Sequence, residues 1–120
     1  MSHDPKAVPW RELIRLMIED IDRIQSFIGD MSKDDFVRDE RTVFAVCYAF
    51  VRIGQAVLQL PESFRDRYPN VPWTEARHFR NFMVHVYMAV DPARLHDSAV
   101  SDLGRMRAAL SGILALNGTP

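Results

Sequence analysis

The longest apolar run of the chain reads Val-Phe-Ala-Val-Cys-Tyr-Ala-Phe-Val and occupies residues 43–51. Its β-branched residues would suit a strand, but apolar residues continue at helical spacing from Phe36 to Leu58, until Pro61 stops the pattern. This length predicts one long helix over residues 33–60, and Ser32 followed by Asp35 resembles a capping box at its start. The run is less than half as long as a membrane span, so none is predicted.

Helices are also predicted on both sides of this segment. Pro9 and Gly29 frame a first helix over residues 9–28, because proline suits the first helical position and glycine the C-terminal cap. Three prolines predict a loop over 61–72, with at most one short helical turn around 62–67. A third helix is expected from Trp73 to about Met88. Asp91-Pro92 begins a fourth, whose core face carries Leu95, Leu103, Met106, Leu110 and Ile113. The pattern predicts an all-α antiparallel bundle.

Length and composition point to one ordinary globular domain over residues 1–120. The chain has 48% hydrophobic and 26% charged residues, which argues against disordered, collagen-like or coiled-coil chains. Its single cysteine, Cys47, cannot form an internal disulfide and lies in an apolar run, where a small buried side chain is expected. The N-terminus lacks the apolar stretch of a secretory signal. These features predict a reducing, cytoplasmic environment.

Charge is distributed unevenly along the chain. Residues 1–40 hold 6 basic and 10 acidic side chains, net −4, whereas residues 41–120 hold 9 basic and 6 acidic ones, net +3. Several arginines surround the proline-rich middle: Arg65, Arg67, Arg77 and Arg80. They make up either a solvated basic face or a phosphate site, since the guanidinium fork suits phosphate oxygens.

The segment Arg80-Asn81-Phe82-Met83-Val84-His85-Val86-Tyr87 inserts four polar side chains into an apolar helix. At about 100° per residue, Arg80 and Tyr87 lie about 20° apart and Asn81 and His85 about 40° apart. Phe79, Phe82, Met83 and Val86 are expected to face the core. The helix therefore offers a cation, an amide, an imidazole and a phenol to one groove, a set that fits phosphate chemistry.

Each of these residues also has a structural interpretation. His85 could be a core histidine, Tyr87 an interface aromatic, Asn81 a helix-packing hydrogen bonder, and Arg80 an ion-pair partner of Glu75. No spacing of Cys, His or carboxylate residues predicts a metal site.

The order and intervals of these motifs resemble the R-N-x-x-x-H-x-Y signature of HEPN-domain proteins, specifically the HepT-like toxins of prokaryotic toxin–antitoxin pairs. The resemblance covers roughly residues 13–115. Beside Arg80-Asn81-x-x-x-His85-x-Tyr87, it includes Ile53-Gly54, Leu60-Pro61, Pro69-x-Val71-Pro72-Trp73 and Asp91.

The resemblance implies a four- or five-helix HEPN bundle that forms a homodimer with a composite, metal-independent RNase site and no cofactor. Arg80 and His85 are the implied catalytic residues, with Asn81 in support. RNA cleavage through the 2′-hydroxyl needs a base, an acid and cations for the added phosphorane charge. Two symmetry-related His85 residues could supply base and acid, and two Arg80 residues could bind the phosphate oxygens.

HepT-like toxins are also similar in their partner, a minimal nucleotidyltransferase antitoxin that can transfer AMP to the tyrosine of H-x-Y, here Tyr87. A bulky anionic group beside Arg80 would fill the groove and occupy the cation needed for RNA. One departure from the family is Gln55, where glutamate is more frequent. The alternatives are a non-enzymatic HEPN module that binds a nucleotide or a partner in the same groove, and a purely structural helical adaptor.

Overall fold

The computed structural model describes residues 8–82 and 91–117, all of whose regular elements are helical. The predicted all-α bundle is therefore confirmed. Its elements in chain order are α1 (Trp10–Ile28), α2 (Lys33–Arg38), α3 (Glu40–Gln59), α4 (Glu62–Asp66), α5 (Trp73–His78), the 3-10 turn η1 (Phe79–Asn81), α7 (Pro92–Ser101) and α8 (Leu103–Leu116).

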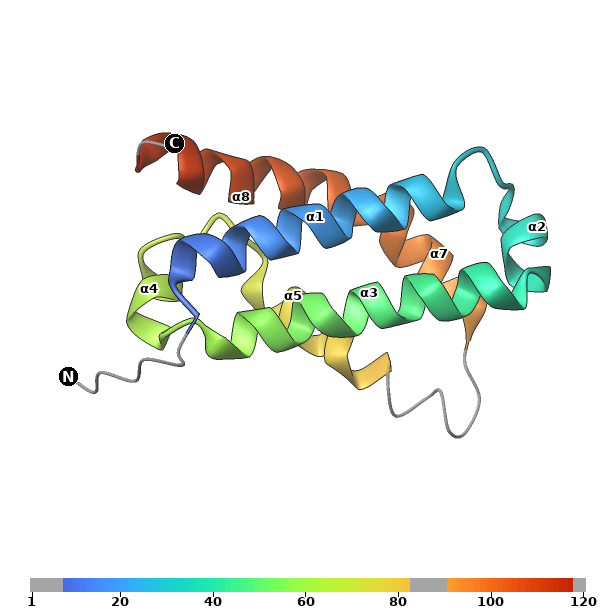
Figure 1. Cartoon of the computed structure of the whole chain (residues 1–120), viewed down its shortest axis with the longest axis horizontal. Helices are drawn as coiled ribbons and strands as arrows, with labels where there is room; N and C mark the ends of the chain where they lie inside the picture. Colours follow the sequence, from blue (N-terminus) through green and yellow to red (C-terminus); the bar gives the residue numbers. More distant parts are fainter. Residues whose placement is uncertain (1–7, 83–90, 118–120) are drawn as a thin grey trace.

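The two long helices α1 and α3 form the centre of the bundle. They lie side by side along the long axis of the molecule, and α8 packs on the other side of α1 (Figure 1). Fully buried side chains fill the space between them, among them Ile14, Met17, Ile21, Val46 and Phe50. The predicted core residues of the last helical segment, from Leu95 to Ile113, are also buried, as is Cys47.

The helix ends follow the predicted caps where short polar residues or glycine mark them. Gly29 adopts a positive φ of 50° directly after α1, a conformation that glycine adopts without strain. The Ser32 hydroxyl accepts a hydrogen bond from the Asp35 backbone nitrogen at 3.1 Å. Asp91 caps α7 in the same way and Pro92 is its first residue.

Two predicted helices are each divided in two. The helix expected over 33–60 breaks at Asp39, whose backbone leaves the helical region and whose Oδ1 accepts from the Thr42 backbone nitrogen at 3.0 Å. Aspartate favours this role because its carboxylate can replace a backbone acceptor at a helix start. The fourth helix breaks at Asp102, which separates α7 from α8.

The third helix starts at Trp73, as predicted, but it tightens into the 3-10 turn η1 at Phe79. The loop before it contains the single short helix α4, close to the expected turn. The prediction that this helix continues to Met88 falls outside the described residues.

Helix α3 has the length and hydropathy of a membrane-spanning segment, yet more than half of its most apolar stretch is buried inside the bundle. The core helix of a globular protein can have the same length and composition as a membrane span. No other described helix is long and apolar enough to cross a membrane.

Candidate functional site

The structure places two of the four predicted site residues. Arg80 and Asn81 are adjacent in η1, and both are exposed. His85 and Tyr87 lie outside the described residues, so their predicted positions beside Arg80 and Asn81 stay predictions.

Two phenylalanines fix which side of this turn faces the core. Phe79 and Phe82 are buried and meet the ring of Phe50 edge-on, with centroid distances of 4.7 and 5.3 Å. This confirms the predicted core side for these two residues. The side chains of Arg80 and Asn81 are left on the solvent side of the turn.

Gly54 allows η1 to approach α3 closely. A β-carbon at position 54 would lie 2.5 Å from the backbone nitrogen of Arg80 and 3.1 Å from the carbonyl oxygen of Arg77. Any side chain there would push the turn away, because atoms of a neighbouring backbone cannot yield as a flexible side chain does. Gly54 therefore holds the Arg80 segment against the rigid central helix.

Arg80 takes part in none of the ion pairs found among the described residues. The suggested pairing with Glu75 is wrong, since the Glu75 carboxylate lies 3.4 Å from the Arg105 guanidinium on α8. The Arg80 guanidinium is thus exposed and available to an anion.

Gln55, the departure from the family pattern, lies next to Gly54 on α3. It is exposed and lines a groove of about 320 Å³ between α1 and α3, together with Tyr48 and the buried Asp20. Asp20 is bound there by Arg23 and Arg52, with N–O distances of 2.7 and 3.2 Å. Gln55 forms no hydrogen bond with Arg80 in the described part of the chain.

Cys47 is the one nucleophilic sulfur of the chain and lies directly beneath the site, with its Sγ 3.9 Å from the Phe82 carbonyl oxygen. Burial raises the pKa of its thiol. A neutral, buried thiol is a packing residue rather than a nucleophile. Within residues 8–82 and 91–117, no group of three His, Cys, Asp or Glu side chains could hold a metal ion.

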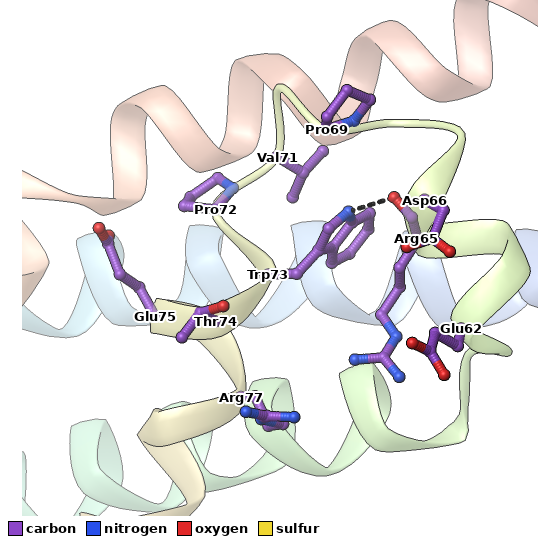
Figure 2. A pocket seen from close by; sticks show the side chains of 10 residues that line it. All are labelled: Glu62, Arg65, Asp66, Pro69, Val71, Pro72, Trp73, Thr74, Glu75 and Arg77. Carbon is purple, nitrogen blue, oxygen red and sulfur yellow. Dashed lines mark hydrogen bonds between the residues drawn. The ribbon is translucent and has the colours of Figure 1, made fainter.

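A second feature adjoins the segment that leads to Arg80. A pocket of about 560 Å³ opens between α4 and α5, and the side chains of Arg65 and Arg77 line it (Figure 2). The sequence places these arginines around the proline-rich middle, but their spacing does not reveal that they share one cavity.

Comparison with protein families places the chain among ribonucleases. The family model described as "Ribonuclease HepT-like" matches residues 17–113. The chain belongs to this family.

Two relatives illustrate the similarity. The Methanocaldococcus jannaschii protein named "Putative RNase MJ0127" is 33% identical over 71% of this chain and 70% of its own length. The Thermococcus cleftensis protein named "Probable ribonuclease HepT" is 29% identical over 81% of this chain and 88% of its own. No solved structure shows significant similarity to the chain.

Proposed function

We propose that the chain is a metal-independent endoribonuclease toxin of a prokaryotic toxin–antitoxin pair, acting as a homodimer with a composite site. The observation that carries the proposal is Arg80: a cation on the surface, fixed against α3 at Gly54 and without an ion pair to any described carboxylate. An exposed guanidinium on a backbone segment that packs against α3 is suited to stabilise the charge of a phosphorane.

In the proposed reaction, the 2′-oxygen attacks the adjacent phosphorus while the bond from phosphorus to the 5′-oxygen breaks. His85 of one chain takes the proton of the 2′-hydroxyl, and the second His85 donates a proton to the leaving 5′-oxygen. The products are a 2′,3′-cyclic phosphate and a free 5′-hydroxyl. An imidazole has an ordinary pKa of about 6.5, so it can accept or donate a proton at neutral pH.

The exposed face of α3 supports the homodimer. Phe44, Tyr48 and Leu58 are 52%, 65% and 39% exposed. At about 100° per residue, they lie about 40–120° around the helix from Gly54. A two-fold axis that lies in the interface plane and crosses this stripe perpendicular to α3 would cover it and bring the Arg80 segments of both chains to one side of the interface.

The proposed partner is a minimal nucleotidyltransferase antitoxin, which inhibits the toxin by forming a complex, by transferring AMP to Tyr87, or by both. An AMP group on Tyr87 would place a phosphate within reach of Arg80 and compete with RNA for that cation.

The test is cleavage of a mixed RNA by purified protein in EDTA, with His85→Ala as the inactive variant and His78→Ala as the control. His78 is an exposed histidine on α5 and has no role in the proposed chemistry. We expect His85→Ala to lose about 100-fold or more of the rate and His78→Ala to lose none. Equal activity of both variants, or activity only with added divalent metal, would refute the mechanism.

A further inference from the structure

The pocket between α4 and α5 has two unlike halves. The loop 67–72 and the first residues of α5 form an apolar wall, with Pro69, Val71 and Pro72, and Trp73 stands in the middle (Figure 2). Arg65 extends from α4 toward the part of α5 that carries Arg77, so that both guanidinium groups lie below the indole ring in this view.

Trp73 fixes the distance between the two helices. Its Nε1 donates to the carbonyl oxygens of Arg65 at 3.1 Å and Tyr68 at 2.9 Å, and the residue is only 9% exposed. The first residue of α5 is thus tied to the end of α4. The pocket is preformed, and a ligand need not order its walls.

The two arginines lack anionic partners within the described structure. Neither Arg65 nor Arg77 takes part in an ion pair there, and the buried Nε of Arg65 has no hydrogen-bond acceptor. The terminal nitrogens of both guanidinium groups therefore have no ion-paired carboxylate that would compete with an anionic ligand.

Three carboxylates also line the pocket, and they restrict where an anion can bind. Glu75 is engaged by Arg105, and Asp66 lies away from Arg77 at the far end of the pocket. Glu62 points toward Arg65 from the same helix but forms no ion pair with it among the described contacts. Its charge would repel an anion bound at Arg65.

Arg77 connects the pocket to the Arg80 turn along the chain. Arg77 precedes Arg80 by about one helical turn, and backbone atoms of both residues pack closely against Gly54. Arg77 of the pocket and Arg80 of the candidate cleavage site therefore belong to one segment whose backbone packs against α3.

We propose that Arg65 and Arg77 form a subsite for a backbone phosphate of RNA, next to the phosphate that Arg80 binds. The inference rests on the proposed function, because it assumes that an RNA strand bound at Arg80 continues past Arg77 to Arg65. Two guanidinium forks suit one phosphate, and the Pro69–Pro72 wall offers an apolar surface to the attached nucleoside. Trp73 acts as the positioning residue of this subsite.

The experiment measures binding of a fluorescently labelled 2′-O-methyl RNA oligonucleotide by anisotropy. This probe keeps the phosphates but lacks the nucleophilic hydroxyl, so binding is read without cleavage. Arg65→Gln and Arg77→Gln are compared with Arg67→Gln, a matched control from the same segment whose guanidinium lies over the rings of Phe64 and Tyr68 at 5.4 and 5.8 Å.

We expect each pocket variant to bind about tenfold more weakly and to lower the salt slope of log K by about 0.7, while Arg67→Gln stays near wild type. Glu62→Gln should tighten binding, because it removes the repulsion beside Arg65. Thermal melting verifies that each variant is folded.

Three results would overturn the subsite: equal affinities for the pocket variants and Arg67→Gln, displacement of the RNA by an equal charge concentration of polyglutamate peptide, or no RNA binding by wild type. The proposed function is judged separately. If the pocket variants weaken RNA binding as expected but wild type cleaves no RNA, the proposed nuclease activity is refuted while the proposed phosphate subsite is supported.

Discussion

A β-carbon on Gly54 of α3 would lie 2.5 Å from the backbone nitrogen of Arg80, closer than folded proteins tolerate. The position of the candidate catalytic arginine therefore depends on the absence of a side chain on a neighbouring helix.

Gly54→Ala should consequently damage both stability and activity. The added methyl must displace η1, at a cost of about 1–3 kcal/mol, and should lower RNA cleavage by moving Arg80. Gly112→Ala is the control: nothing lies within 4 Å of a β-carbon there, so helix propensity should raise stability by about 0.5–1 kcal/mol. Urea denaturation measures both. A Gly54→Ala protein as stable and active as wild type would contradict the close packing.

Tyr48→Glu should weaken the homodimer. Tyr48 is the most exposed member of the proposed α3 interface, at 65%, and a carboxylate there would be desolvated on association. Val100→Glu is the matched control, since Val100 is 70% exposed on α7 and outside that stripe. Analytical ultracentrifugation should show a dissociation constant at least about tenfold higher for Tyr48→Glu alone. Equal dissociation constants for the two variants would show that the dimer interface lies outside this stripe of α3.

The ion pair between Asp22 of α1 and Arg107 of α8 should stabilise the bundle only above acidic pH. The Arg107 guanidinium, at 2.7 Å, holds the pKa of the Asp22 carboxyl below its ordinary value of 3.8. A lowered folded pKa means that the contribution is present above about 3.8 and is lost as pH falls through the folded value. Because both groups are about half exposed, Asp22→Asn should cost at most about 1 kcal/mol at pH 7.

The difference between wild type and Asp22→Asn should shrink in urea denaturation as the pH falls below about 3.8, and it should vanish once Asp22 is protonated in the folded state as well. A difference that persists or grows in acid would mean that Asp22 acts through packing instead.

Tyr87→Phe should fold, dimerise and cleave RNA while resisting AMP transfer by the cognate antitoxin. The change keeps the ring and removes the acceptor oxygen. Intact-mass spectrometry after incubation with antitoxin and ATP should show AMP-sized increments on wild type and none on the variant. Equal modification of both proteins would place the acceptor elsewhere, and no modification of either would leave complex formation as the mode of inhibition.

Local signals in the sequence predicted the helix starts well. Ser32 and Asp91 act at caps because a short polar side chain can accept from the first free backbone nitrogens. Apolar periodicity identifies a buried face but not an interruption within it, so the breaks at Asp39 and Asp102 were missed. Both lie in segments whose apolar spacing continues across the break.

The site could be predicted only in part, because its geometry depends on contacts between elements. The role of Gly54 follows only from the contact between η1 and α3 at that residue, which the sequence does not reveal. The convergence of Arg65 and Arg77 depends on the two hydrogen bonds of Trp73, which no residue spacing reveals. The prediction of the core side succeeded at Phe79 and Phe82, since amphipathic spacing requires only the local helix.

The composite site is tested most directly by a heterodimer of one wild-type and one His85→Ala chain, purified through two different affinity tags. If base and acid come from the two chains, one substitution removes an essential group from the shared site. RNA cleavage by the heterodimer should then fall about 100-fold or more, close to the level of the doubly substituted dimer. A heterodimer that keeps half of the wild-type rate would show that each chain carries a complete site, and would contradict the account.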